Sequence, residues 1–346
     1  MDVMCIAHIM ESNLKATIKM EVRCKNLPLL DIIVPHYKEP YEIVAPFFNV
    51  LKSQKGVNFN DFRVLLIHDG TPDFYMASNK GPLNLIERII PHKGVSACRN
   101  YGIDHADAKW ICFCDCDDSY TSIFSLMMIF HVLKDSASDN FDLIWGPFYM
   151  HNDGGLAKCM NPNSVFIHNK YYRTSFLKEY NIRFCEDLYM SEDSAFNTVV
   201  NLEMDRKRLG QINYPEPLYA WCRRPGSITM DLSKWLSNTE GHFNRNLYVL
   251  EEFRKRGCLA KDTMIARVIT DVYVMLNKTE IKEDTTAFLN RVRDFYNENE
   301  ETYKALPESI MKAALEASDK DMGNTPEEIS KRIGLDQWVE KNIKGN

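Results

Sequence analysis

The stretch K-W-I-C-F-C-D-C-D-D-S, from Lys109 to Ser119, decides the fold of this chain. Its first half is a short apolar run, which is typical of a strand buried on both faces of a sheet. The run leads directly into three carboxylates, Asp115, Asp117 and Asp118. Carboxylates at the carboxyl end of a central strand lie where open α/β sheets bind ligands. Like charges this close repel one another, and a divalent cation relieves that repulsion, so the stretch predicts a metal site.

A second interpretation of the same acids needs no metal. Asp118 or Ser119 suits the N-cap of a helix, and the apolar segment I-F-S-L-M-M-I-F follows closely enough to form that helix. The other two acids would then be solvated loop residues. The D-x-D-D pattern does not separate these interpretations by itself, because short acidic patterns are common.

Composition is that of a soluble globular protein. The 346 residues, 45% hydrophobic and 26% charged, suffice for one large domain and a smaller one. The net charge of -6 provides no global basic field, so nucleic acid is not a favoured partner. We expect no signal peptide and no transmembrane segment, since no run approaches the roughly 18 apolar residues of a membrane span. The ten cysteines lack zinc-type pairs, which predicts free thiols and a cytoplasmic location.

Strand and helix patterns alternate along the first two thirds of the chain. The expected strands are 29–34, which Pro35 ends, 62–67, 85–90, 110–114, 141–145 and 164–168. The expected helices are one with Pro46 in its first turn, 96–106, one after Ser119, 172–180 and one that opens near Ser191. This order predicts a doubly wound α/β domain.

The last third of the chain shows helical patterns. Apolar residues recur at helical spacing from Met264 to Val272, and Thr325-Pro-Glu-Glu328 combines a capping box with proline at the first helical position. We therefore predict three parts, namely an N-terminal extension over 1–28, an α/β domain over 29–230 and a helical C-terminal domain over 231–346.

Six short motifs together resemble those of the inverting family-2 glycosyltransferases, which have the GT-A fold. They are I-V-P-H-Y at 33–37, L-I-H-D-G at 66–70, G-V-S-A-C-R-N-Y-G at 94–102, F-C-D-C-D-D at 113–118, S-E-D-S-A-F at 191–196 and Y-A-W-C-R-R-P-G-S at 219–227. Each motif alone is weak, but six in the family's order favour the metal interpretation of D-x-D-D. The resemblance implies a Rossmann-like mixed sheet with helices on both faces, and it does not extend into 231–346.

The resemblance also implies a reaction. A sugar moves with inversion from a nucleotide-sugar donor, expected to be UDP-linked, to an acceptor hydroxyl. Mn²⁺ or Mg²⁺ neutralises the leaving diphosphate, held by Asp115 and Asp117 with Asp118 as a third candidate ligand. In the family, the first Asp of the motif often lies beside the ribose and the later one reaches the metal.

The same resemblance assigns residues to the donor nucleotide. They are Pro35, Tyr37, Glu39, Asp69, Arg99, Asp115 and Arg223, with Arg224 as the alternative to Arg223. Arg99 suits the diphosphate because a planar guanidinium matches phosphate oxygens, unless it is a surface helix arginine. Asp69 is expected at the uracil or ribose edge, or else it only forms the turn before Gly70. Tyr37 either stacks on the base or belongs to the core.

Two loops depart from the family pattern. His68 stands where the first Asp of D-D-G is usual. His36, Lys38 and Glu39 replace the small or Asn residues that are common after the opening proline. We therefore expect unusual nucleotide contacts at both loops.

Asp193 is the expected general base, with Glu192 as the backup. A partly desolvated carboxylate beside the acceptor hydroxyl can accept its proton. The competing interpretation is that both acids merely favour a helix N-terminus, where the helix dipole stabilises negative charge. The glycosyltransferase hypothesis requires Asp117 and Asp193 to line one cleft.

Two other classes of function stay open. A nucleotidyltransferase shares the α/β domain and metal carboxylates but releases pyrophosphate and needs no base at S-E-D-S-A-F. A non-catalytic carbohydrate- or nucleotide-binding module would not need the intact set of acids together with Arg99. For a transferase, the expected acceptor is a surface or cell-wall glycan. The alternative is a modified nucleic-acid base, which the net negative charge of the chain disfavours.

Overall fold

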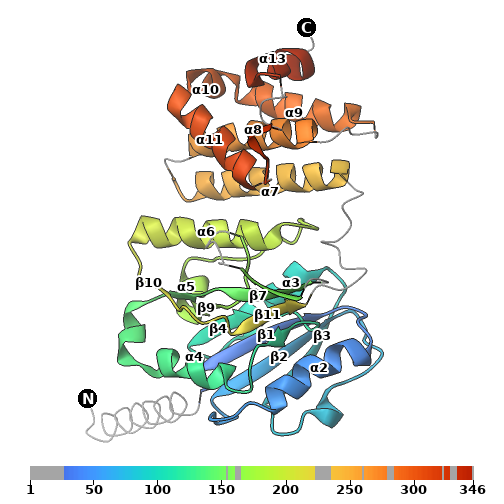
Figure 1. The fold of residues 1–346 in the computed structure, drawn as a ribbon, viewed down its shortest axis with the longest axis vertical. Helices are drawn as coiled ribbons and strands as arrows, with labels where there is room; N and C mark the ends of the chain where they lie inside the picture. The colour runs from blue at the N-terminus through green and yellow to red at the C-terminus, as the bar shows by residue number, and fades with distance from the viewer. Residues whose placement is uncertain are drawn as a thin grey trace, which may run out of the picture. The chain divides into compact units, whose positions relative to one another are not determined.

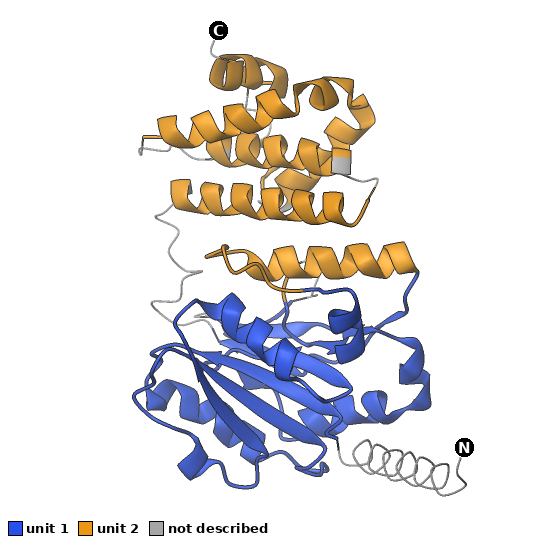
Figure 2. Ribbon diagram, turned by 180° about the vertical axis from the view of Figure 1, so that it is seen from behind, with its two compact units in different colours: residues 1–161, 167–182, 208–222 blue, residues 162–166, 183–207, 223–346 orange. Residues whose placement is uncertain are grey.

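A computed structural model describes residues 27–152, 155–159, 165–222, 235–258, 261–278, 284–321, 323–327 and 333–344. The chain divides into two compact units (Figure 2). The first comprises 1–161, 167–182 and 208–222, and the second comprises 162–166, 183–207 and 223–346. The segment 183–207 is thus grouped with the C-terminal helices rather than with the α/β unit. The domain boundaries expected from the sequence stay a prediction.

A seven-stranded mixed sheet forms the centre of the first unit (Figure 1). Its strands, in spatial order, are β10 (Gln211–Asn213), β6 (Leu143–Trp145), β9 (Lys170–Arg173), β4 (Trp110–Phe113), β1 (Leu30–His36), β2 (Phe62–Asp69) and β3 (Leu85–Ile90). All neighbouring pairs are parallel except those of β9, which runs antiparallel to β4 and β6. The carboxyl ends of β1, β2 and β4 therefore meet at one edge of the sheet.

Helices cover both faces of this sheet. On one face lie α3 (Val95–His105) and α5 (Thr174–Glu179), and on the other lie α2 (Tyr41–Lys52) and α4 (Ser125–Lys134) (Figure 1). Phe130 of α4 packs against Phe62 of β2, with ring centroids 6.2 Å apart. On the opposite face α3 approaches β1 so closely at Gly102 that an added Cβ would lie 2.5 Å from Ile33. The α/β fold class predicted from the sequence is confirmed.

A second, four-stranded sheet flanks the acidic loop. Its order is β5 (Ser119–Tyr120), β11 (Tyr219–Cys222), β7 (Phe148–Asn152) and β8 (Gly155–Cys159). Two short 3₁₀ turns, η1 (Ala77–Asn79) and η2 (Ser136–Asn140), complete the first unit. Because β11 pairs antiparallel with β5, the chain near residue 220 lies beside the D-x-D-D stretch.

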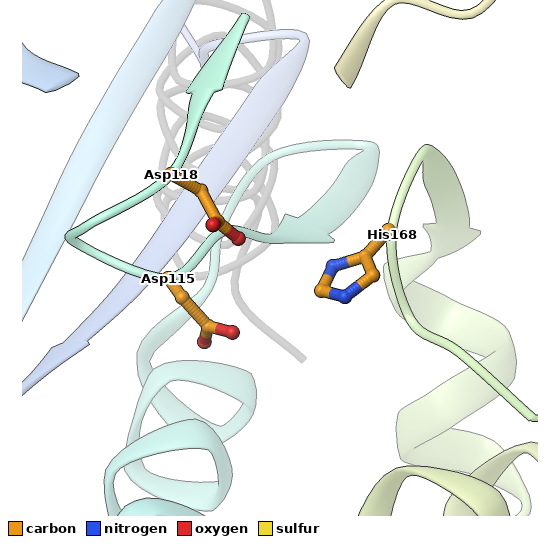
Figure 3. A group of neighbouring side chains, drawn as sticks. All are labelled: Asp115, Asp118 and His168. Atoms are coloured by element: carbon orange, nitrogen blue, oxygen red, sulfur yellow. The ribbon is translucent and has the colours of Figure 1, made fainter. Parts of the chain in front are cut away.

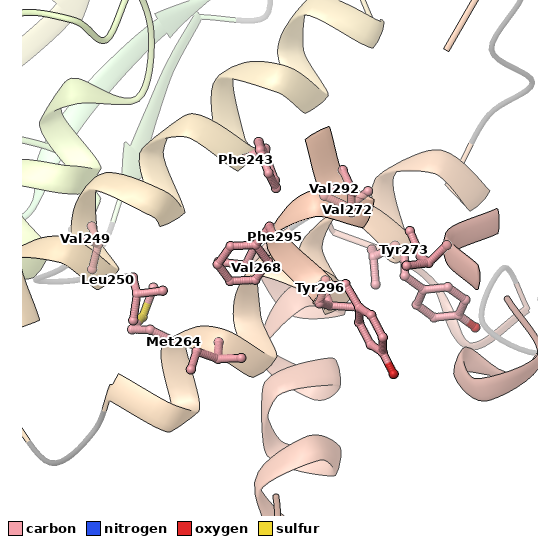
Figure 4. Close-up of a cluster of buried hydrophobic side chains, with 14 of the residues drawn as sticks. Phe243, Val249, Leu250, Met264, Val268, Val272, Tyr273, Val292, Phe295 and Tyr296 are labelled. Carbon is pink, nitrogen blue, oxygen red and sulfur yellow. The ribbon is translucent and has the colours of Figure 1, made fainter. Parts of the chain in front are cut away.

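The second unit is helical throughout its described elements. It contains α6 (Glu192–Lys207), α7 (Trp235–Lys255), α8 (Lys261–Lys278), α9 (Thr286–Glu298), α10 (Glu300–Ala305), α11 (Glu308–Asp321), α13 (Leu335–Val339) and the π-helical turn η4 (Glu340–Lys344). Figure 4 shows its core, in which Phe243 of α7, Val268 of α8 and Phe295 of α9 are buried together. The helical character predicted for the C-terminal part is confirmed. None of the described helices has the length and apolar character needed to cross a bilayer.

Two predicted element boundaries near prolines are wrong. β1 continues through Pro35 to His36. Proline has no N–H to donate, and Pro35 lies beyond Ile33, the last residue of β1 that pairs with β4. The first helix begins at Tyr41, so Pro46 lies in its interior rather than in its first turn. The carbonyl of Pro40 accepts the first helical N–H groups, so Pro40 rather than Pro46 marks the start.

Two further predictions around the site are also wrong. The helix after the acidic stretch begins at Ser125, and Ser119 belongs to β5, so neither Asp118 nor Ser119 caps that helix. The strand expected over 164–168 is found instead at Lys170–Arg173, and no residue in the described part of 164–168 belongs to a strand. Asn169 has φ 51°, a left-handed conformation that an apolar pattern does not reveal.

Candidate active site

Three side chains converge at the carboxyl end of β4. Asp115 and Asp118 follow this strand, and His168 precedes β9 (Figure 3). One ligand atom from each lies within 4.8 Å of the other two. Among the described residues, Asp117 does not belong to this group.

Asp118 is buried and fixed by β11. Its Oδ2 accepts a 2.5 Å hydrogen bond from the hydroxyl of Tyr219, and its Oδ1 accepts one of 2.7 Å from the N–H of Cys222. The same Tyr219 oxygen accepts the backbone N–H of Asp115 at 3.0 Å. Burial, with repulsion from Asp115 added, raises the pKa of the Asp118 carboxyl well above its ordinary value. A cation at this point would relieve that repulsion.

His168 is held by aromatic rings. It stacks on Tyr219 and Trp221, with centroids at 5.1 and 5.7 Å, and meets the edge of Phe148 at 4.9 Å. Burial lowers the pKa of His168 to about 4, so the imidazole is neutral at neutral pH and retains a lone pair for a metal. The sequence interpretation missed His168, since a histidine that ends an apolar run carries no distinctive signal.

Arg99 of α3 lies against this cluster. It is 2% exposed, and its Nη2 donates to Oδ1 of Asp115 at 3.1 Å. The alternative of a surface helix arginine is therefore wrong. The structure brings Arg99, Asp115 and Asp118 together, as the family resemblance implies.

A pocket of about 250 Å³ lies at the carboxyl ends of β1 and β2. It is lined by His36, Tyr37, Lys38, Asp69, Gly70, Thr71, Pro72 and His92. Tyr37 is 41% exposed, so it is not a core tyrosine, and its ring stacks on His92 with centroids 4.3 Å apart. This aromatic pair and the adjacent carboxylate suit a planar, hydrogen-bonding ligand such as a nucleobase.

Asp69 does more than form a turn. Its Oδ1 accepts the N–H of Lys93 at 2.7 Å, and its Oδ2 accepts the N–H of Gly94 at 2.9 Å. His92 also contacts Oδ2, at 2.7 Å. Gly94 takes up this position with φ 94°, a conformation that favours glycine. Asp69 thus fixes the loop that leads into α3, and its contact with a nucleotide stays a prediction.

The two histidines that depart from the family pattern contact each other. Their Nδ1 atoms are 2.9 Å apart, and Nε2 of His36 lies 2.9 Å from the carbonyl of Glu39. Because a carbonyl only accepts, Nε2 of His36 donates to the carbonyl of Glu39. The other nitrogen of His68 faces Glu87 at 3.4 Å. His68 therefore connects β1, β2 and β3 beneath the pocket, where the family usually has a carboxylate.

The remaining predicted residues are distributed over both units. Pro35 lies in β1 and Glu39 in the loop after it, where a carboxylate oxygen accepts the N–H of Tyr37 at 2.8 Å. Glu192 and Asp193 occupy the first turn of α6, which belongs to the second unit. That Asp117 and Asp193 line one cleft stays a prediction. Arg223 and Arg224 lie outside the described residues.

The donor set fits a divalent cation. Carboxylate oxygens suit Mg²⁺ and Mn²⁺, whereas an imidazole nitrogen is a poorer partner for the harder Mg²⁺. The cysteines nearby are not an alternative set of ligands. Cys112, Cys114 and Cys116 are buried, and burial raises the pKa of Cys114 and Cys116 well above the ordinary thiol value. They are small core residues, as the sequence predicted.

Comparison with known proteins agrees with this geometry. Residues 31–197 match the family described as glycosyl transferase family 2. The uncharacterized glycosyltransferase EpsJ of Bacillus subtilis (strain 168) is 27% identical over 232 residues, which cover 59% of this chain and 63% of EpsJ. The minor teichoic acid biosynthesis protein GgaB of the same organism is 23% identical over 242 residues, covering 60% of this chain and 26% of GgaB. The chain thus matches less than two thirds of the length of either relative.

Solved structures share the fold. Residues 1–349 of TarS from S. aureus in complex with UDP superpose with a TM-score of 0.57 at 17% identity, covering 86% of this chain and 92% of that one. The complex of the same protein with UDP-GlcNAc gives a TM-score of 0.54 at 18% identity, covering 86% and 93%. The fold is therefore of the GT-A class. The match to glycosyl transferase family 2, over residues 31–197, agrees with this fold.

Proposed function

We propose that this protein is a metal-dependent inverting glycosyltransferase. It takes a sugar from a UDP-linked donor and transfers it to an acceptor hydroxyl. The observation that carries the proposal is the convergence of Asp115, Asp118, His168 and Arg99 at the carboxyl end of β4 in a family-2 domain. The UDP and UDP-GlcNAc complexes of TarS, which shares the fold, support a uridine nucleotide as the donor.

The pocket at β1 and β2 is proposed to hold the nucleotide, with Tyr37 beside the base and Asp69 at the uracil or ribose edge. Arg99 faces the diphosphate, where its planar guanidinium can bind two phosphate oxygens. When bound, Mn²⁺ or Mg²⁺ supplies positive charge that stabilises the departing diphosphate. Asp115, Asp118 and His168 would hold this cation. Asp117, the later acid of the family motif, is a fourth candidate ligand.

Two matched variants test the metal ligands. We expect His168→Gln and Asp117→Ala each to weaken UDP binding about tenfold or more in the presence of Mn²⁺, as measured by calorimetry, and to leave metal-free UDP binding unchanged. Loss in His168→Gln alone would assign the metal to the cluster in Figure 3 without Asp117. Wild-type affinity in both variants, with Mn²⁺ required, would contradict both assignments.

Asp193 is proposed as the general base, with Glu192 as the backup. The family match spans the D-x-D-D stretch and the S-E-D-S-A-F segment together, which supports placing both in one catalytic domain. We expect Asp193→Asn to retain donor binding and to lose transfer by a factor of about 10² to 10⁴. Glu192→Gln is the matched control, one position along the same helical turn, with a much smaller expected loss. Full transfer by Asp193→Asn would remove this residue from the role.

The acceptor is proposed to be a hydroxyl of a cell-surface or cell-wall glycan. The name of GgaB, which assigns that relative to teichoic acid biosynthesis, supports this class. A screen of melting temperature over UDP-sugars, with and without Mn²⁺, identifies the donor first, because ligands that bind the folded state raise the melting temperature.

A further inference from the structure

The segment that carries the candidate base shares a hydrophobic core with the C-terminal helices. Leu188, just before α6, and Ala195, in its first turns, are buried in the same cluster as Phe243 and Val249 of α7. This packing explains why 183–207 groups with the second unit. The position of Asp193 therefore depends on helices that lie beyond the family-2 match, which ends at residue 197.

Gly241 of α7 lies directly against the turn that precedes α6. A Cβ at Gly241 would lie 2.3 Å from Sδ of Met190 and 3.2 Å from the hydroxyl of Tyr189. That hydroxyl also bonds to Ser237 of α7, with its Oγ 2.9 Å away and the backbone carbonyl as a further acceptor. An alanine at this point of α7 would require the side chain of Met190 to move, and with it the turn before α6.

The turn that α7 contacts contains a strained residue. Ser191 has φ 59°, a left-handed conformation that costs a non-glycine residue roughly 1 kcal/mol or more. Its carbonyl accepts the N–H of Ala195 at 3.0 Å, which is the first backbone bond of α6. The backbone of Ser191 therefore sets the direction of the helical turn that holds Asp193. Such a conformation persists only where surrounding contacts hold it.

Arg245 lies four residues after Gly241 on α7 and contacts the first turns of α6. Its Nη2 donates to Oγ of Ser194 at 3.0 Å and to Oγ1 of Thr198 at 2.9 Å. Its Nη1 donates to Oδ1 of Asn246 at 2.6 Å, which fixes the guanidinium. Ser194 is the direct neighbour of Asp193, so these two hydrogen bonds from one nitrogen limit the rotation of α6 about its axis.

We propose that α7 is the positioning element for the general base, with Gly241 and Arg245 as the positioning residues that fix the helical turn carrying Asp193. The inference rests on the proposed role of Asp193. Neither residue needs to touch a substrate. A displacement of about 1 Å in a catalytic group can cost about 10²-fold in rate, so small changes in α7 should appear in turnover.

Gly241→Ala tests the proposal, and Gly334→Ala in the same unit is the matched control. A Cβ added at Gly334 would meet no other atom within 4 Å, so alanine fits there. In Gly241→Ala we expect amide hydrogen exchange over 189–195 to accelerate about tenfold or more, with Mn²⁺-dependent UDP affinity unchanged. We also expect kcat for UDP release from UDP-GlcNAc to fall about 10-fold to 10²-fold with little change in KM for the donor. Gly334→Ala should match wild type in every measurement.

Arg245→Met and a double-variant cycle separate positioning from general stability. If Arg245 acts through Asp193, Arg245→Met lowers kcat in the wild type and has no further effect in the Asp193→Asn background. Additive losses, or exchange over 189–195 unchanged in Gly241→Ala, would overturn the proposal. Wild-type turnover in Asp193→Asn, or no UDP release by the wild type, would instead refute the proposed base or donor, while the exchange measurement still decides whether α7 holds the turn.

Discussion

Two buried carboxylates in the first unit, Asp31 at the start of β1 and Asp118 after the end of β4, have opposite surroundings. Arg63 donates to both oxygens of Asp31 at 2.8 Å, and the N–H groups of Asp107 and Ala108 add bonds of 2.9 and 3.0 Å. Asp118 instead accepts its bonds from two neutral donors, the Tyr219 hydroxyl and the Cys222 N–H, and it faces a second carboxylate, Asp115.

This difference distinguishes a carboxylate that stabilises the fold from one that we propose to bind a ligand. The charge of Asp31 is compensated within the chain, so its burial needs no further partner. Burial and the repulsion of Asp115 raise the pKa of Asp118, and a cation is the partner that makes this arrangement favourable. Burial alone therefore does not separate the two acids; the sign of the neighbouring charge does.

The largest expected effect follows from removing the compensated acid. Asp31→Ala leaves Arg63, 12% exposed, without its principal partner, and we expect the free energy of unfolding to fall by about 3 kcal/mol or more. Urea unfolding measures the loss. Asp139→Ala is the control, since Asp139 pairs with Lys109 at the surface and its loss should change stability little. An unfolding midpoint near wild type in Asp31→Ala would show that the two acids differ less than their surroundings suggest.

For Asp118 we expect the opposite result, namely a small change in stability and a loss of UDP affinity. Asp118→Asn removes one of two repelling charges, so stability without metal should change by no more than about 1 kcal/mol. UDP affinity in Mn²⁺ should fall about tenfold or more, because a carboxylate ligand is lost. Thermal unfolding with and without Mn²⁺ and UDP measures both. A large loss of metal-free stability with full Mn²⁺-dependent affinity would reverse the assignment.

The smallest effect concerns Glu87, a carboxylate near the pocket that resembles Asp31 in being satisfied by the chain. It accepts the N–H groups of Met76 and Ala77 at 2.6 Å and faces His68. Although burial acts in the opposite sense, these bonds lower the pKa of Glu87 below its ordinary value of 4.5. A lowered folded-state pKa gives stability that is present above the unfolded pKa and is lost as pH falls through the folded value.

We therefore expect the urea midpoint to decline as pH falls below about 4.5, and Glu87→Gln to flatten part of that decline. A profile in Glu87→Gln that stays parallel to wild type throughout this range would exclude Glu87 as a contributor.

Local sequence patterns predicted much of the fold. Apolar runs predicted β1, β2 and β4, because strands buried on both faces are rich in apolar residues. The hairpin of β7 and β8 was not predicted, because three of the five residues of β8 are exposed and it lacks such a run. The sequence placed a strand at 164–168, but the strand begins at Lys170, because Asn169 turns the chain just before it.

The sequence by itself determined that carboxylates end a buried strand, and its motifs placed Arg99 with them. Only the tertiary structure decided which groups complete the site. Tyr219 reaches Asp118 across 101 positions of sequence, and His168 joins from a different strand connection. Such partners are set by sheet order and strand register, which depend on long-range packing rather than on neighbouring residues.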